Sequence, residues 1–202
     1  MILNIYTFLT YIMDIFYLLN SPFCHQMSSR SFFIAGFKMP LCARCTAIHI
    51  GLLLGYLFHL LFMRKENQCI CLLSLILFNV PLAIDGITQL YGLRESTNEI
   101  RLLTGTLSGL SFGLVIAYVI EAFNNEHKDL KLELFNTTLM KRQAHVAISS
   151  EILAYLIIYV GVLSNSLLYL IYISLYLTIS SFLHNIIVPI YIMVAMIKCI
   201  KT

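Results

Sequence analysis

The chain has 202 residues, of which 59% are hydrophobic and 11% are charged, and its mean hydropathy is +0.86. Soluble domains contain roughly 45–50% apolar and 25% charged residues, and no soluble fold of this size could hide so much apolar surface. The formal net charge of +3 arises at segment ends and in loops, without the basic stripe that follows a phosphate backbone. We therefore expect an integral membrane protein that does not bind nucleic acid.

Six apolar windows, bounded by charged residues or proline, predict six short transmembrane helices. Each window is close to the roughly 20 residues that cross a hydrocarbon core, and lipid offers no hydrogen-bond partner to an open backbone. We expect an all-α, polytopic helical bundle in a single membrane domain over residues 1–202, with the motifs in about 20–115 and the C-terminal spans in about 151–198. In chain order the windows cover residues 2–20, 44–63, 69–91, 102–123, 151–173 and 175–198.

Two boundaries in this pattern need interpretation. Residues 2–20 are taken as a retained first span, weakened by Asp14, because no basic residue precedes them and no small-x-small cleavage site follows. The last two windows are separated only by Tyr172 to Leu175, which predicts a very tight turn or a re-entrant segment.

The basic residues near the span ends predict the orientation, since Lys and Arg favour the cytoplasmic side. The larger group comprises Arg64, Lys65, Lys128, Lys131, Lys141, Arg142, Lys198 and Lys201, and the smaller group comprises Arg30, Lys38, Arg44, Arg94 and Arg101. We therefore predict a multi-pass protein of the plasma membrane with both termini in the cytoplasm. Residues 21–45 and 92–101 would then lie on the outer side.

The connector at residues 124–150 mixes apolar and charged residues. Its apolar members are Leu130, Leu132, Leu134, Phe135, Leu139 and Met140. Two interpretations are open, an amphipathic helix on the inner membrane surface and a plain solvated connector.

The first polar constellation combines the adjacent pair Cys24 and His25 with a CxxC motif formed by Cys42 and Cys45. A CxxC turn brings two sulfurs to one metal, and a distant Cys-His pair can supply two more ligands, so these four residues could form a tetrahedral zinc site. An oxidising outer compartment would instead favour a disulfide among the same cysteines. A redox pair and structurally buried thiols are further alternatives that the spacing leaves open.

The second constellation lies around the turn after the third predicted span. Asp85 and Gln89 are four residues apart and share one helix face, and Arg94, Asn98 and Arg101 follow at helical spacing. Ionisable groups at membrane depth are costly and usually line a bundle interior or a substrate path. Two guanidinium groups suit a phosphate or carboxylate ligand. We expect these five residues to form a catalytic or binding site, and an Asp–Arg pair that only ties two spans together is the structural alternative.

Glycines at four-residue spacing predict close helix packing. Gly105, Gly109 and Gly113 lie in the fourth predicted span, and Gly51 and Gly55 repeat the pattern in the second. Small residues at this spacing let helix backbones approach closely. We therefore expect the span that carries Arg101 to lie in the centre of the bundle.

Several motifs together resemble the prokaryotic membrane-protein family called "domain of unknown function 2085" over about residues 20–115. The resemblance implies a small polytopic protein of prokaryotic plasma membranes, and the family has no assigned activity. The motifs are Cys24-His25-Gln26, Arg30-Ser31-Phe32-Phe33, Pro40-Leu41-Cys42-Ala43-Arg44-Cys45-Thr46, Asp85-Gly86-Ile87-Thr88-Gln89, Gly92-Leu93-Arg94-Glu95-Ser96-Thr97-Asn98 and Arg101-Leu102-Leu103-Thr104-Gly105.

The chain departs from this pattern at Ala47 and His49, which stand where a glycine and a tyrosine are expected. A shorter likeness is to the VanZ-like membrane proteins, a family linked to glycopeptide resistance and the cell envelope. It rests on the order of an acid, an amide, an arginine, a second amide and spaced glycines. In this chain these are Asp85, Gln89, Arg94, Asn98, Gly105 and Gly109.

Three functions follow as hypotheses. The first is a metal-assisted enzyme or binding protein whose outer-facing cavity holds an anionic ligand that is lipid-linked or phosphate-bearing, with the arginines as a clamp and Asp85 as a general base or metal ligand. The second is a small transporter or metal-handling protein with Asp85 on a permeation path. The third is a membrane scaffold without a ligand.

Overall fold

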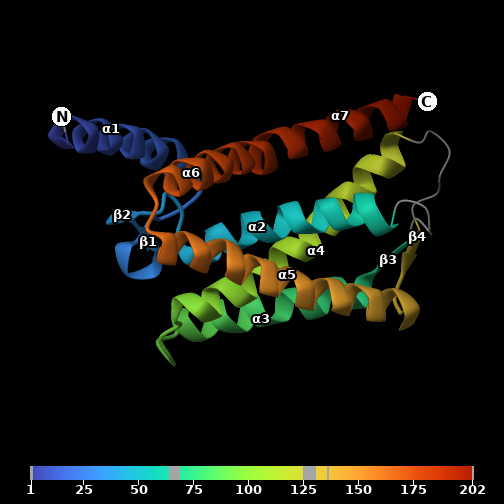
Figure 1. Cartoon of the computed structure of the whole chain (residues 1–202). Helices are drawn as coiled ribbons and strands as arrows, with labels where there is room; N and C mark the ends of the chain where they lie inside the picture. Colours follow the sequence, from blue (N-terminus) through green and yellow to red (C-terminus); the bar gives the residue numbers. More distant parts are fainter. Residues whose placement is uncertain (1, 64–68, 125–130, 136, 202) are drawn as a thin grey trace.

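The protein, described by a computed structural model over residues 2–63, 69–124, 131–135 and 137–201, is built from helices (Figure 1). This confirms the predicted all-α class. The helices are α1 (Ile2–Asn20), α2 (Ala43–Phe58), α3 (Leu72–Leu90), α4 (Asn98–Asn124), α5 (Thr137–Ser164), α6 (Leu167–Phe182) and α7 (Val188–Lys201). Short elements are η1 (Ser28–Arg30), η2 (His59–Met63), η3 (Leu183–Ile187), β1 (Phe33–Ile34), β2 (Phe37–Lys38), β3 (Cys69–Cys71) and β4 (Lys131–Glu133).

Five helical stretches among the described residues are long and apolar enough to cross a membrane. They are Ala43–Phe62, Leu72–Leu90, Asn98–Ala122, Thr137–Ser164 and Leu167–Val194. The multi-pass prediction is therefore confirmed at the level of composition and length. Helix α1 is not among these five, so the sixth span stays a prediction.

The predicted boundary between the last two spans is wrong. The break lies at Asn165 and Ser166, seven residues before Tyr172, where Asn165 adopts a left-handed conformation with φ of 47°. The side chain of Ser166 accepts a hydrogen bond from the backbone N–H of Tyr169 and caps α6. The position of this turn is determined by a polar residue that caps the start of α6. The hydropathy windows did not reveal that position.

The connector prediction for residues 124–150 is also wrong over its second half. Helix α5 begins at Thr137 and runs without interruption to Ser164, so residues 137–150 belong to a span. Part of this segment, residues 125–130 and 136, lies outside the described residues. The predicted basic positions Arg64, Lys65 and Lys128 lie outside them as well.

Helices α2 and α4 pack face to face through their spaced glycines, a pattern that predicted close helix packing without naming the partner helix. A Cβ atom at Gly109 would lie 2.1 Å from the carbonyl oxygen of Ile48, and one at Gly51 would lie 2.3 Å from the carbonyl oxygen of Thr106. Neither position can hold a side chain without separating the two backbones. Helix α4 is accordingly the most buried of the five stretches, with 61% of its apolar window inside the molecule.

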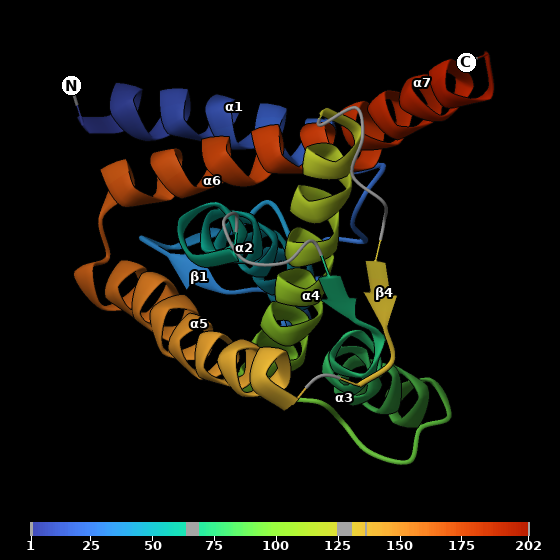
Figure 2. The same ribbon diagram turned by 90° about the vertical axis from the view of Figure 1, so that its right-hand side faces the viewer.

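A second layer formed by α1, α6 and α7 lies across this bundle (Figure 2). Helices α1 and α6 run side by side in the same direction, with Ser174 next to Met13 and Thr178 accepting a hydrogen bond of 2.7 Å from Asn20. The N-terminus and the C-terminus lie at opposite ends of the molecule (Figure 1). The fold therefore gives no support to a shared cytoplasmic location of both termini, which stays a prediction.

Two of the segments that connect the helices, residues 21–42 and 91–97, lie at one end of the bundle, here called the loop end, whereas β3 and β4 pair at the other end (Figure 1). Strands β1 and β2 form a two-stranded hairpin at the loop end, with Ala35 and Gly36 in its turn at positive φ. The N–H of Ala35 donates a 2.6 Å hydrogen bond to the side chain of Asn165, which ties the hairpin to the turn between α5 and α6. This end positions both polar constellations.

Candidate functional site

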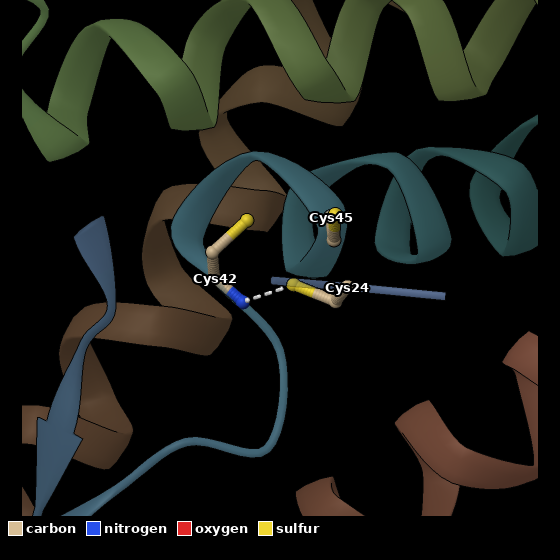
Figure 3. A group of neighbouring side chains, drawn as sticks. All are labelled: Cys24, Cys42 and Cys45. Atoms are coloured by element: carbon tan, nitrogen blue, oxygen red, sulfur yellow. Dashed lines mark hydrogen bonds between the residues drawn. The ribbon is translucent and has the colours of Figure 1, made fainter. Parts of the chain in front are cut away.

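Three thiols meet at the loop end (Figure 3). The sulfur atoms of Cys24, Cys42 and Cys45 all lie within 4.8 Å of one another, and all three cysteines are free. Cys42 is the residue that precedes the first turn of α2, and Cys45 lies in that turn, so the CxxC spacing places both sulfurs on the same helix end. The structure therefore brings together three of the four predicted metal ligands.

Cys24 reaches the cluster from the segment that follows α1. Its backbone N–H donates to the carbonyl of Asn20, and its sulfur accepts hydrogen bonds from the N–H groups of Gln26 (3.4 Å) and Cys42 (3.3 Å). Lys38 donates a 2.8 Å hydrogen bond to the carbonyl of Gln26, which braces the same bend. Backbone contacts thus hold the Cys24 sulfur against the start of α2.

The fourth predicted ligand, His25, is not part of this group. Its side chain is exposed, while Cys24 is 7% exposed. Adjacent residues in an extended segment point in different directions, so only one member of the Cys24–His25 pair faces the cluster. A metal at the three thiols would keep one coordination position open to another ligand, which is a property of catalytic rather than closed structural zinc sites.

The thiols also influence one another's protonation. Hydrogen bonds from Cys24 and Cys45 lower the pKa of Cys42, although burial acts in the opposite direction. The hydrogen bond that Cys24 shares with Cys42 raises the pKa of Cys24. The cluster thus favours a thiolate at Cys42, and thiolates are the form in which cysteine binds metals or attacks as a nucleophile.

The carboxylate of Asp85 is the centre of the second constellation and is 1% exposed. One of its oxygens pairs with the guanidinium of Arg44 at the start of α2, and the other pairs with Arg94 at 2.6 Å. Arg44 also donates to Gln89 over 3.5 Å, and Arg94 donates to Thr88 over 3.0 Å. Three segments, α2, α3 and the α3–α4 turn, are therefore joined at one buried acid.

A polar hollow of about 510 Å³ opens beside this network. Arg101 is 5% exposed, donates a 2.8 Å hydrogen bond to Asn98, and has an Nε atom without a hydrogen-bond partner among the described residues. Three of the five candidate residues, Gln89, Arg94 and Arg101, line the hollow. Asp85 and Asn98 are not in its lining and contact it through Arg94 and Arg101. Its lining residues are Ser29, Arg30, Gln89, Gly92, Arg94, Glu95, Ser96 and Arg101.

Sequence reasoning did not assign two of the arginines to this site. Asp85 pairs with Arg94, one of the two arginines expected in that role, and also with Arg44, which was not expected there. Arg30 lines the hollow from the segment between α1 and β1. Arg44 stands inside the CxxC motif, one residue before Cys45. The sequence signal that could have assigned Arg44 to the site was its position between two cysteines at the start of a predicted span.

This arrangement favours binding over base catalysis at Asp85. Both carboxylate oxygens already face guanidinium groups, so the acid orients Arg44 and Arg94 and compensates their charge. The hollow itself presents three guanidinium groups, from Arg30, Arg94 and Arg101, against the single carboxylate of Glu95. Its positive charge suits an anionic ligand.

The part of the chain that contains this site is similar to a family of predicted membrane proteins. Residues 24–118 match the family model described as "Predicted membrane protein (DUF2085)". An uncharacterised protein of Methanothermobacter thermautotrophicus is 38% identical over 92 residues, which is 46% of this chain and 82% of that protein. The chain belongs to this family.

A second relative is an uncharacterised protein of Methanocaldococcus jannaschii, 41% identical over 112 residues that cover 53% of this chain and 67% of that protein. No solved structure is significantly similar to the chain. The family match begins at Cys24 and ends at Tyr118, so it contains the thiol cluster and the whole polar hollow. Helices α5, α6 and α7 lie outside it.

Proposed function

We propose that this protein binds an anionic, phosphate-bearing ligand at the loop end, and that the physiological ligand is attached to a membrane lipid. The observation that carries the proposal is Arg101. Its guanidinium is almost fully buried at the edge of a polar hollow, and its Nε–H has no partner among the described residues. A buried charged donor without a partner is costly, and an anion in the hollow would satisfy it.

The composition of the hollow supports phosphate rather than a smaller anion. Three guanidinium groups from three segments line the hollow, and the N–H groups that they do not use on Thr88, Asp85 and Asn98 are charged donors that suit phosphate oxygens. The hydroxyl groups of Ser29 and Ser96 add neutral hydrogen-bond donors to the same lining. A volume of about 510 Å³ exceeds what one phosphate fills, so there is room for a head group.

An apolar groove along α5 supports a lipid-linked ligand over a soluble one. The groove has a volume of about 530 Å³ and runs from Glu151 to Leu163 along one face of the helix. Its Tyr159 contacts Phe32, with ring centroids 6.5 Å apart, and Phe32 is two residues from Arg30 in the hollow. An acyl chain in this groove would therefore approach the hollow from the membrane.

The thiol cluster fits a soft metal ion, with zinc as the first candidate. Three sulfurs within 4.8 Å of one another can bind one ion through Cys24, Cys42 and Cys45, and a favoured thiolate at Cys42 suits that role. A metal there would supply charge and a fixed geometry at the start of α2. A disulfide between two of the cysteines is the competing state in an oxidising compartment, and elemental analysis with a free-thiol assay distinguishes the two.

A transporter is the second candidate, because polar contacts continue below the site between α3 and α4. Asn79 donates a 2.8 Å hydrogen bond to Ser111 and accepts a 2.7 Å hydrogen bond from Ser108. Such a polar seam within a span is typical of a solute path as well as of interhelical bonding. Phosphate uptake by vesicles that contain the purified protein tests this candidate, since a transporter must move its solute.

The deciding experiment replaces Arg101 by Gln. Wild type and variant are reconstituted with phosphatidic acid diluted in phosphatidylcholine, and inorganic phosphate is tested in parallel. We expect the affinity for phosphatidic acid to fall by about tenfold or more, because a charge-assisted hydrogen-bond donor is worth about 1.5–3 kcal/mol. Lys141→Gln, which removes an exposed charge on α5 outside the loop end, is the matched control and should leave the affinity unchanged. Equal affinities of wild type and Arg101→Gln would contradict the proposal.

A further inference from the structure

One residue, Arg44, belongs to both constellations. It stands between Cys42 and Cys45 in the first turn of α2, and its guanidinium pairs with Asp85 in α3. Its Nε atom is buried and has no hydrogen-bond partner among the described residues. The position of its guanidinium is therefore fixed by the helix turn that carries it and by Asp85 and Gln89.

A continuous set of contacts leads from the thiols to the hollow. The first turn of α2 carries two of the sulfurs and Arg44, and Arg44 holds one oxygen of Asp85. The other oxygen holds Arg94 at 2.6 Å, and Arg94 lines the hollow. A displacement at the start of α2 would therefore reach the anion-binding surface through only two ion pairs.

The opposite side of this turn is closed by α4. A Cβ atom at Gly105 would lie 2.7 Å from the carbonyl oxygen of Arg44 and 2.7 Å from the side chain of Ala47. The turn cannot move toward α4, and its position on the other side depends on how tightly the thiols hold it to Cys24. Hydrogen bonds to a sulfur are weak, whereas metal–thiolate bonds would fix the same three atoms rigidly.

We propose that a divalent metal ion at Cys24, Cys42 and Cys45 increases the affinity of the hollow for its phosphate-bearing ligand by fixing the position of Arg44. This inference rests on the proposed function and adds its regulation. Ligand binding must strengthen metal binding by the same factor, because the coupling free energy between two sites is reciprocal. The class of regulator is a soft divalent cation, with Zn²⁺ as the probe.

The test measures the affinity of the reconstituted protein for phosphatidic acid after treatment with a chelator and after loading with Zn²⁺, with bound zinc counted by elemental analysis. We expect Zn²⁺ to tighten binding by about fivefold or more, within the usual range of coupling between sites. In Arg44→Gln we expect zinc to bind and the affinity to be the same with and without it. Arg44→Lys, which keeps a charge at the site but lacks the planar fork, should show a reduced dependence.

Cys45→Ser is the matched control, since it removes a sulfur and leaves Arg44 in place. It should bind phosphatidic acid as the chelated wild type does, without response to Zn²⁺. Wild type that binds zinc without a change in affinity, or that binds no zinc, overturns the regulation while the proposed function stands. If wild type binds phosphatidic acid in neither state, the proposed function itself fails.

Discussion

Helix α4 and the long helix formed by α6 and α7 have nearly the same hydropathy and opposite surroundings. The mean hydropathy of their apolar windows is 1.8 and 1.7, but 61% of the α4 window is buried inside the molecule against 17% of the window in Leu167–Val194. Glycines on α4 admit the backbone of α2, whereas α6 and α7 present large side chains outward. Hydropathy therefore identifies a span, and spaced small residues indicate which face of that span another helix packs against.

The same contrast separates the family-matched part from the rest. The thiols, the buried acid and the arginines belong to α2, α3, α4 and the segments that precede and connect them, and all of these residues lie within residues 24–118. Helices α5 to α7 contribute apolar surface and, along α5, the apolar groove. Four pairs of substitutions, each a test variant and a control, measure how much buried and exposed positions contribute to the free energy of unfolding.

The largest effect is expected at Asp85, the buried acid of the family-matched region. Asp85→Ala leaves Arg44 and Arg94 without their shared carboxylate, and breaking a buried pair costs about 3–5 kcal/mol. We expect a loss of about 3 kcal/mol in the free energy of unfolding, since both arginines are partly exposed. Chemical unfolding in detergent measures it. Asp14→Ala removes an exposed acid from α1 and should change little. Similar losses in both variants would contradict the assigned role of Asp85.

A matched pair of glycines tests the packing of α4. Gly109→Ala puts a Cβ atom 2.1 Å from the Ile48 carbonyl, and overpacking of this kind costs about 1–3 kcal/mol. We expect a clear drop in the melting temperature. A Cβ at Gly86, in α3, meets nothing within 4 Å. Gly86→Ala should therefore be neutral or stabilise the protein by about 0.4–1 kcal/mol. If both substitutions destabilise equally, close approach of α2 and α4 is not the reason for Gly109.

A pair of leucines compares the two helices directly. Leu110 in α4 is fully buried and Leu168 in α6 is 68% exposed. Leu110→Ala should destabilise by about 2 kcal/mol because it leaves a cavity, whereas Leu168→Ala should stay within about 0.5 kcal/mol. Thermal unfolding of the two variants in the same detergent gives the difference. An equal cost at both positions would mean that a further partner covers α6.

The smallest effect is expected where α5 contacts α4. The Tyr155 hydroxyl donates a 3.0 Å hydrogen bond to the backbone carbonyl of Glu99, and Tyr155→Phe removes it at a cost of about 1 kcal/mol. Tyr172 in α6 is 69% exposed, so Tyr172→Phe serves as the control. A change of less than about 0.3 kcal/mol in Tyr155→Phe would show that this hydrogen bond does not help to hold α5 against α4.

Much of the fold and part of the site could be predicted from sequence. Apolar windows gave α2, α3 and α4 to within a few residues, and glycine spacing indicated close packing of α2 and α4 without showing that they pack against each other. The α5–α6 turn was misplaced because both helices are continuously apolar on either side of Asn165. In the site, the CxxC spacing gave Cys42 and Cys45, but Arg44 as a second partner of Asp85 beside Arg94 was missed.

The sequence by itself determined a multi-pass helical membrane protein, close helix packing at the spaced glycines, and two polar constellations near span ends. These features depend on local composition and on spacing along one helix, which covalent geometry fixes. Only the tertiary structure decided that Cys24 joins the cluster without His25, that α1 runs parallel to α6, and that Arg44 links the thiols to Asp85. These choices depend on the rotation of helices about their own axes, which is set by contacts between segments distant in the chain.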